Sequence, residues 1–135
     1  MSCLFRSLSY FIENMDENSL RKMIADHLET DPDLFGEGEQ TRLSKVVPES
    51  EGVSHQEYVR RMRLPSTWGG AIEIKAFCDL FHAVVRVKVL SSGEWIVFEP
   101  EQCQPKNFTP LQKTCPMLSI SWNGSHYEPL RSNEI

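Results

Sequence analysis

The sequence predicts an α+β fold in which helices pack on a mostly antiparallel β-sheet. Up to residue 81 the apolar residues recur at spacings of three and four, which is typical of helices with one buried face. From residue 82 onward stretches of alternating apolar and polar residues appear, which is typical of half-buried strands. Helices that precede strands along the chain favour the α+β class. The length of 135 residues predicts one domain, residues 1–135.

Two amphipathic helices are expected before residue 31. The apolar positions between residues 4 and 12 fall on one face of the first helix, which puts Cys3 in its first turn. The second helix takes Asn18 or Ser19 as its N-cap, since short polar side chains accept hydrogen bonds from the first turn. It ends before Asp31-Pro32.

Residues 31–53 are expected to form a loop with one helical turn at 43–47. The segment is rich in glycine, proline and acidic residues and offers few apolar side chains for packing. Residues 13–51 hold eleven acidic and four basic residues, a net charge of −7, whereas the whole chain carries −5. Long loops in compact domains often serve as lids or binding surfaces. The acidic segment is therefore either a solvated loop or a surface for a basic partner.

Two more helices follow this segment. Ser54 and Glu57 form a capping-box pattern at the start of a third helix. This helix directs three apolar side chains inward, those of Tyr58, Val59 and Met62. The segment Trp68-Gly69-Gly70 leads into a fourth helix over residues 71–81. We expect the tryptophan in the core and close helix packing at the two glycines.

Four strands complete the chain. Valines alternate with basic residues in the first strand, and turn sequences rich in serine and glycine separate the strands of each hairpin. The expected strands are residues 82–90, 94–98, 117–122 and 126–130. Residues 99–114 contain three prolines and are expected to be irregular.

Composition excludes several classes of protein. An acidic pI near 5.4 without a basic stripe argues against nucleic acid as a partner, and the basic cluster at 60–63 fits a solvated helix face. No apolar run approaches the length of a membrane span. No cysteine lies in a CxxC pair, so neither a structural zinc site nor another metal site is expected. We predict a cytoplasmic protein with reduced thiols in which Cys78, Cys103 and Cys115 are structural.

Cys3 and His126 are the candidates for chemistry. Backbone N–H groups in the first turn of a helix favour a thiolate, and a thiolate is the nucleophilic form of cysteine. His126 follows a turn and begins a strand, in which Glu128 lies on the same face two residues later. A carboxylate that orients an imidazole serving a thiol is the arrangement of a nucleophilic triad. Spacing alone also fits a buried cysteine and a surface histidine.

Three segments of the chain resemble the ovarian-tumour (OTU) family of cysteine deubiquitinases. Residues 2–9 resemble the nucleophile segment, and residues 58–76, with Trp68-Gly69-Gly70, resemble the middle motif. Ser125-His126-Tyr127-Glu128 is similar to the terminal motif. All three follow in the order of the family and span residues 2–131. The resemblance implies an OTU-like, papain-type fold.

The resemblance implies a thiol-dependent ubiquitin hydrolase. Cys3 matches the nucleophile, His126 the general base, and Glu128 the orienting position where the family more often has Asp or Asn. The reaction is hydrolysis of the isopeptide bond at the ubiquitin C-terminus, with no metal or cofactor. The loop Trp122-Asn123-Gly124 matches the wall of the channel for the ubiquitin tail, although Trp122 also fits the core. The implied partners are ubiquitin or polyubiquitin chains, with no nucleic acid or membrane partner, and we expect a monomer.

One departure from the family pattern leaves two expectations open. The family nucleophile is usually preceded by Asp-Gly-x, whereas here Met1 occupies the Gly position and the Asp would precede the chain. That loop supplies part of the oxyanion hole, and one oxyanion donor is worth about 10²–10³ in rate. The chain is therefore expected to be a truncated form of a competent enzyme or a catalytically impaired ubiquitin-binding module.

Overall fold

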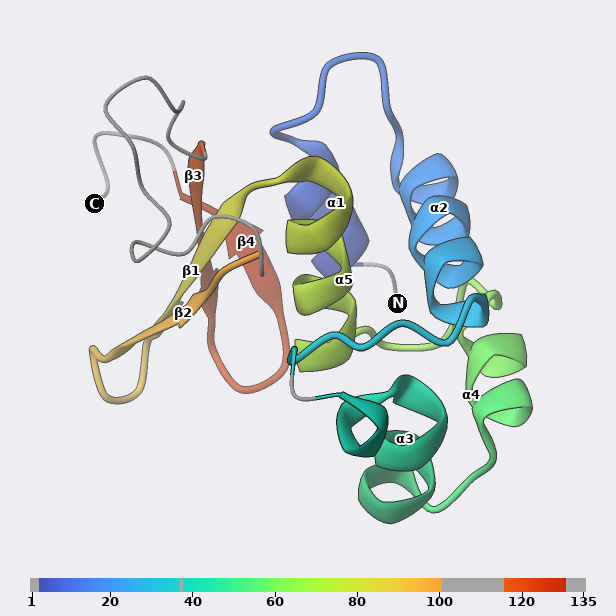
Figure 1. Ribbon diagram of the computed structural model, residues 1–135. Coiled ribbons are helices and arrows are strands. Elements are labelled where there is room, and N and C mark those ends of the chain that lie inside the picture. Colours follow the sequence, from blue (N-terminus) through green and yellow to red (C-terminus); the bar gives the residue numbers. More distant parts are fainter. Residues whose placement is uncertain (1–2, 37, 101–115, 131–135) are drawn as a thin grey trace, which may run out of the picture.

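The computed structural model describes residues 3–36, 38–100 and 116–130 (Figure 1). The helices are α1 (Cys3–Ser9), α2 (Glu17–Glu29), the short 3₁₀ helix η1 (Glu39–Thr41), α3 (Leu43–Glu51), α4 (His55–Met62) and α5 (Ala71–Phe81). The strands are β1 (Val84–Val89), β2 (Trp95–Phe98), β3 (Met117–Trp122) and β4 (Tyr127–Pro129). Within the described ranges, no helix is long and apolar enough to cross a bilayer.

The strands form one sheet in the order β2-β1-β3-β4. The two outer pairs are antiparallel, whereas the central pair, β1 with β3, is parallel. The predicted α+β class is confirmed, and the sheet is mostly antiparallel by pairing. The parallel central pair is a feature that the alternation of residues within each strand does not predict. The predicted irregular segment lies mostly outside the described residues, as do Cys103 and Cys115.

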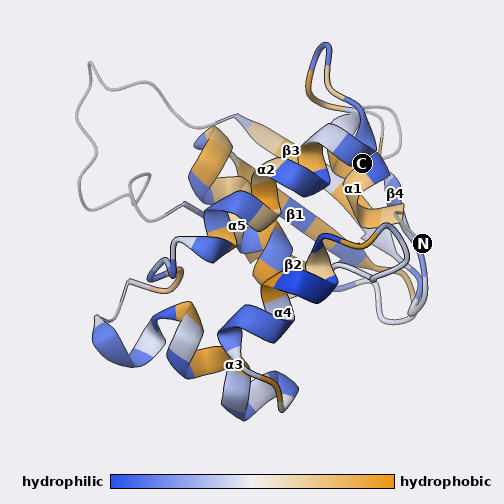
Figure 2. Cartoon of the chain, turned by 90° about the vertical axis from the view of Figure 1, so that its right-hand side faces the viewer, coloured by the Kyte–Doolittle hydropathy of each residue, from blue (hydrophilic) through white to orange (hydrophobic). Residues whose placement is uncertain are grey.

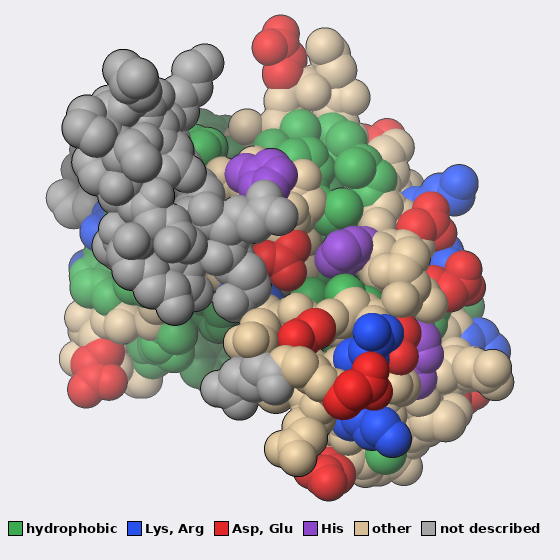
Figure 3. All heavy atoms as spheres, in the orientation of Figure 1, with side chains coloured by type: hydrophobic (Ala, Val, Ile, Leu, Met, Phe, Trp, Pro, Cys, Tyr) green, Lys and Arg blue, Asp and Glu red, His purple; other side chains and the backbone are tan. Residues whose placement is uncertain are grey.

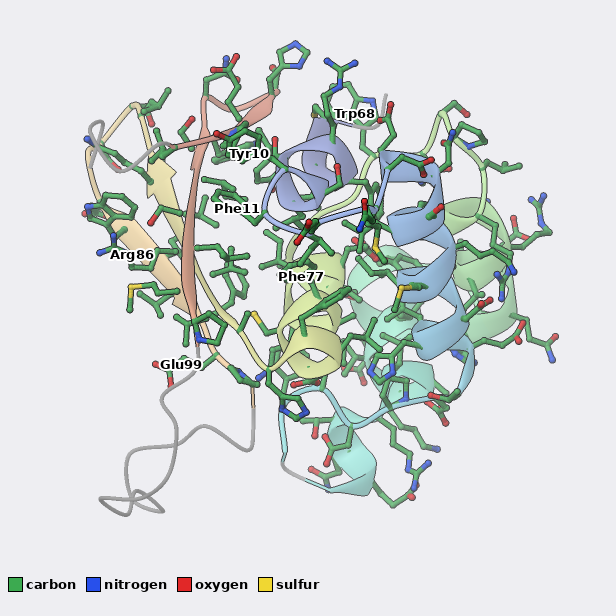
Figure 4. All side chains as sticks on the ribbon, turned by 90° about the horizontal axis from the view of Figure 1, so that it is seen from above. Tyr10, Phe11, Trp68, Phe77, Arg86 and Glu99 are labelled. Carbon is green, nitrogen blue, oxygen red and sulfur yellow. The ribbon has the colours of Figure 1, made fainter. Side chains whose placement is uncertain are left out.

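The helices gather on one side of the sheet (Figure 1). α5 packs on β1 and β2, α1 packs on β4, and α2 packs on α1, α4 and α5. Hydrophobic residues concentrate where these helices meet each other and the strands (Figure 2). Phe77 lies between α5 and the sheet, whereas Arg86 lies on the outer side of the sheet (Figure 4). The core thus fills the space between the sheet and α1, α2 and α5.

The first two helices differ from the prediction at their ends. α1 ends at Ser9, because the next turn is tightened by the Phe11 N–H donating to the Leu8 carbonyl. The N-cap of α2 is Asp16, so the prediction of Asn18 or Ser19 was wrong. The Asp16 carboxylate accepts the N–H of Ser19 at 2.7 Å, which starts the helix earlier.

Residues 31–53 hold more structure than the sequence predicts. α3 runs for nine residues instead of one turn, and it contributes Leu43 and Val47 to the core. Its first turn is capped by Asp31, whose carboxylate accepts the N–H and the hydroxyl of Ser44. Figure 3 shows basic and acidic side chains intermixed over this region, and Arg42 pairs with Glu39. The segment is therefore a packed helix with a solvated, charged outer face.

Arg21 of α2 is a buried cation that ties the segment after α4 to the core. It is 3% exposed, and its guanidinium lies 4.2 Å from the centre of the Phe5 ring. Its N–H groups donate to three backbone carbonyls, those of Met62, Pro65 and Thr67. A guanidinium in this position both satisfies the carbonyls and holds the chain that leads to Trp68.

We expect Arg21→Met to lower the free energy of unfolding by more than about 2 kcal/mol, because the substitution leaves buried carbonyls without donors. Urea denaturation provides the measurement. Arg60→Met is the matched control, since Arg60 is exposed and pairs with Glu57 on the helix surface. This control is expected to change stability by less than about 1 kcal/mol. An equal effect of the two substitutions would contradict the assigned role of Arg21.

Candidate active site

Cys3 is the first residue of α1, as the sequence predicts. Its side chain is half-buried and is a free thiol. The Cys3 carbonyl accepts the hydroxyl of Ser7 at 2.7 Å, which reinforces the first turn of the helix. The next two residues, Leu4 and Phe5, are buried in the core. The thiol is thus carried by a helix end whose position is set by core packing.

Gly69 contacts the start of α1 directly. A Cβ atom at this position would lie 2.8 Å from Cδ2 of Leu4 and 3.1 Å from the Phe5 ring, which is closer than carbon atoms approach without displacement. The predicted close packing is therefore confirmed at Gly69. It is wrong at Gly70, where an added Cβ would meet nothing within 4 Å. The absence of a side chain at Gly69 allows the segment before α5 to lie against the two residues that follow Cys3.

His126 lies at the end of the turn that joins β3 to β4. The side-chain oxygen of Asn123 accepts the N–H of Ser125 at 2.9 Å and that of His126 at 2.7 Å. The Asn123 N–H donates back to the His126 carbonyl, and Gly124 has a positive φ of 100°. This closed turn fixes the backbone that carries His126, and it is a structural role for Asn123 and Gly124.

The structure brings the segments of the predicted triad together without showing contacts between the three side chains. α1 packs on β4, so the Cys3 helix and the strand after His126 are neighbours. His126 and Glu128 are exposed, and Glu128 lies opposite Ser121 in the sheet register. Among the described residues, no hydrogen bond or ion pair joins the side chains of Cys3, His126 and Glu128.

Tyr127 is the residue of β4 that faces the Cys3 helix. Its ring stacks on Trp122, with centroids 6.3 Å apart. Burial raises the pKa of its phenol, and the negative charges of the Cys3 thiolate and Glu73 raise it further. The Tyr127 hydroxyl is therefore within electrostatic reach of both groups. Trp122 is half-buried and packs against the core, which is one of the two roles considered for it.

Glu73 is a fully buried carboxyl in the first turn of α5. One of its oxygens accepts the N–H of Gly70 at 2.7 Å, and the other accepts the hydroxyl of Tyr58 at 2.5 Å. Burial raises the pKa of Glu73 to about 7, although these two hydrogen bonds act in the opposite direction. The carboxyl joins α4 to the beginning of α5 and holds the glycine segment between them.

An open cleft of about 580 Å³ lies beside this glycine segment, between α3, α4 and the start of α5. Trp68 and Phe35 line it and are 56% and 44% exposed. The prediction that Trp68 belongs to the core was therefore wrong, and Figure 4 shows it beside α1 at the surface. Residue 68 precedes α5, so the apolar periodicity of that helix does not predict whether the residue is buried. Its aromatic side chain alone does not predict burial either.

Sequence reasoning missed three residues of this region, namely Arg21, Glu73 and Tyr127. Charged residues are rarely buried, and nothing in the local sequence marks Arg21 or Glu73 as exceptions. A signal for Glu73 was nevertheless present, because an acid three residues after a helix N-cap often accepts the N-cap N–H. Cys78, expected to be structural, is buried, and burial raises the pKa of its thiol to about 12.

Comparison with known proteins relates the chain to cysteine proteases. A model of the family described as OTU-like cysteine protease matches residues 2–127. The chain is 27% identical to ubiquitin thioesterase OTU1 of Rattus norvegicus and 26% identical to that of Homo sapiens. These alignments cover 98% of this chain but only 34% and 33% of the two relatives. The chain thus spans about one third of the length of these relatives.

Solved structures with the same fold include an OTU domain in complex with ubiquitin. It has a TM-score of 0.67 and 22% sequence identity, over 95% of this chain and 62% of that one. An OTU deubiquitinase from Wolbachia pipientis wMel has a TM-score of 0.70 and 16% identity, over 99% of this chain and 85% of that one. At these levels of identity the likeness shows the fold.

We expect Gly69→Ala to destabilise the protein by about 1–3 kcal/mol, because its methyl group would overlap Leu4 and Phe5. Gly70→Ala is the matched control, and it is expected to leave stability unchanged or to raise it by up to about 1 kcal/mol. Thermal unfolding of the two variants makes the comparison. The assigned contact is wrong if both substitutions have the same effect.

Glu73 is expected to make stability depend on pH. Its pKa is about 7 in the folded protein against an ordinary value of 4.5, so the folded state holds the proton more tightly. The resulting stabilisation is complete below pH 4.5 and is lost as the pH rises through 7. Urea unfolding at pH 5 and pH 8 measures it. Relative to Glu73→Gln, we expect the native chain to lose about 3 kcal/mol between these pH values. A parallel pH dependence of the two proteins would contradict this expectation.

Proposed function

Because the chain belongs to the OTU-like cysteine protease family, we propose that it is a thiol-dependent hydrolase that cleaves the isopeptide bond at the C-terminus of ubiquitin. The match over residues 2–127 confirms the family and the cysteine-protease class that the three sequence motifs predict. Ubiquitin as the substrate rests on the names of the relatives, which are ubiquitin thioesterases, and on the OTU domain structures that contain ubiquitin.

The proposed reaction begins with attack of the Cys3 thiolate on the carbonyl carbon of the last ubiquitin residue. His126 takes the thiol proton and later donates a proton to the departing lysine amine. The products of this step are a free lysine and a thioester between Cys3 and ubiquitin. Water, activated by His126, then hydrolyses the thioester and restores the thiol. Glu128 is the proposed orienting group for the imidazole, and the Cys3 N–H is a proposed donor to the oxyanion.

The observation that carries the proposal is the meeting of the Cys3 helix with β4. α1 packs on β4, and the pKa of the Tyr127 phenol is raised by burial and, to a smaller degree, by the nearby Cys3. His126 is the residue immediately before Tyr127, and its backbone is fixed by Asn123. Adjoining segments thus carry the thiol and the imidazole, and catalytic hydrogen bonds often tighten only on substrate binding.

The rest of the proposal concerns the partner and the setting. The turn formed by Asn123 and Gly124, together with Trp122, is the proposed wall for the ubiquitin tail. The turn is exposed, and a Cβ atom at Gly124 would meet nothing within 4 Å, which supports room for an extended chain to pass. The partner is ubiquitin or polyubiquitin, and the proposed setting is a cytoplasmic monomer.

We expect ubiquitin with a thiol-reactive electrophile at its C-terminus to form a covalent adduct with the chain through Cys3. Intact-protein mass spectrometry detects the adduct, and Cys3→Ala is expected to abolish it. With a fluorogenic ubiquitin C-terminal amide, His126→Ala is expected to lower kcat by about 10²–10⁴-fold. Glu128→Gln is expected to have a smaller effect, since the amide oxygen can still accept from the imidazole.

Cys78→Ala is the control, because Cys78 is buried and the raised pKa of its thiol keeps it in the unreactive form. This variant should form the adduct as the native chain does. Binding of ubiquitin without an adduct would support a ubiquitin-binding module in place of an enzyme. The absence of both ubiquitin binding and adduct formation would contradict the proposed function.

A further inference from the structure

We propose that Glu73 is a positioning residue for the nucleophile, and that it acts through the backbone of Gly69 and Gly70. Its carboxyl group holds the Gly70 N–H, and the adjacent Gly69 sets where the Cys3 end of α1 lies. The inference deepens the proposed function and rests on it only in its kinetic part.

A hydrogen bond connects Glu73 to the glycine segment. Glu73 lies in the first turn of α5 and is only 1% exposed, so the surrounding residues restrict the movement of its side chain. Its oxygen accepts the Gly70 N–H at 2.7 Å, while the Tyr58 hydroxyl holds the other oxygen. The carboxyl is thus fixed at both oxygens, and it fixes the backbone of residue 70 in turn.

Side-chain packing connects the glycine segment to the turn of α1 that carries Cys3. A Cβ atom at residue 69 would lie 2.8 Å from Cδ2 of Leu4 and 3.1 Å from the Phe5 ring, so the ends of these two side chains lie against the backbone of Gly69. Leu4 directly follows Cys3 in the helix, and both Leu4 and Phe5 are buried with little free space around them. In this proposal, a displacement of the glycine backbone is passed through the Leu4 and Phe5 side chains to the turn of α1 that carries Cys3.

Glu73 also lies near the segments of the site. Its charge influences Tyr127 on β4, which also responds to Cys3, and it influences Arg21, whose guanidinium covers Phe5. Glu73 is thus close to both segments that carry the proposed catalytic side chains. A reactive group misplaced by about 1 Å costs about 10²-fold in rate, so this connection has a kinetic consequence.

The test compares two substitutions of similar volume. Glu73→Gln keeps an oxygen that accepts the Gly70 N–H, whereas Glu73→Met fills the same space without an acceptor. Val47→Ala is the control for a general loss of stability, because Val47 is a buried residue of α3, a helix that carries neither Cys3 nor the glycine segment. Hydrogen exchange of residues 4–9 reports the order of α1 without any substrate, and a fluorogenic ubiquitin amide reports kcat and KM.

We expect Glu73→Met to speed exchange in residues 4–9 and to lower kcat by about 10- to 100-fold, with KM within about threefold of the native value. Glu73→Gln should restore both measurements to within about threefold. Val47→Ala should leave kcat and the exchange of residues 4–9 close to native. If Glu73→Met behaves as Val47→Ala does, or if Glu73→Gln is as impaired as Glu73→Met, the proposal is overturned.

Two further outcomes are an unfolded Glu73→Met variant and a native chain without activity. If Glu73→Met does not fold, the double variant with Tyr58→Phe replaces it, because removing both partners leaves no buried hydroxyl without an acceptor. Failure of the double variant to fold would assign Glu73 to the stability of the whole domain and overturn the positioning role. If the native chain cleaves no ubiquitin substrate, the proposed function fails. Hydrogen exchange alone then tests whether Glu73 orders α1.

Discussion

The contact of Gly69 with the start of α1 is the constraint on which the candidate site depends. It places a backbone without a side chain against Leu4 and Phe5, immediately after the proposed nucleophile. Such a contact tolerates little displacement, because interior atoms are packed as densely as in organic crystals. The segment that makes the contact has no regular structure of its own. It is held at one end by Arg21 and at the other by Glu73, the two buried charges of this region.

Arg21 and Glu73 differ from surface ion pairs because they stabilise a backbone segment in the interior. Arg21 donates to backbone carbonyls, and Glu73 accepts from the Gly70 N–H and the Tyr58 hydroxyl, so the bonds of neither depend on an exposed partner of opposite charge. Arg21 receives its geometric specificity from the planar guanidinium, which reaches carbonyls at Met62, Pro65 and Thr67 together. The consequence is that hydrogen bonds to buried side chains hold the irregular chain between α4 and α5. Exposed pairs such as that of Arg60 with Glu57 contribute little to this arrangement.

Local patterns predicted the parts of the fold that local forces determine. The bounds of α5 and β3, the Ser54 cap and the place of Cys3 at the start of α1 follow from periodicity and capping, and the structure confirms them. Features that depend on distant residues were not predictable in this way. α3 is capped by Asp31, thirteen positions before Ser44, and the exposure of Trp68 depends on how α3 and α4 leave a cleft. The roles of His126 and Glu128 remain predictions, because within the described ranges no hydrogen bond or ion pair joins their side chains to Cys3 or to each other.

The protonation of Glu73 connects the stability of the domain with the electrostatics of the site. Glu73 also acts on Tyr127 of β4, where its negative charge adds to burial in raising the pKa of the phenol. Burial raises the pKa of Glu73 to about 7, so that near neutral pH a large fraction of the carboxyl groups is uncharged. The protonated and the ionised forms both keep an oxygen that accepts the Gly70 N–H. The fold therefore retains the hydrogen bond that orders the glycine segment whether or not the carboxyl group carries a charge.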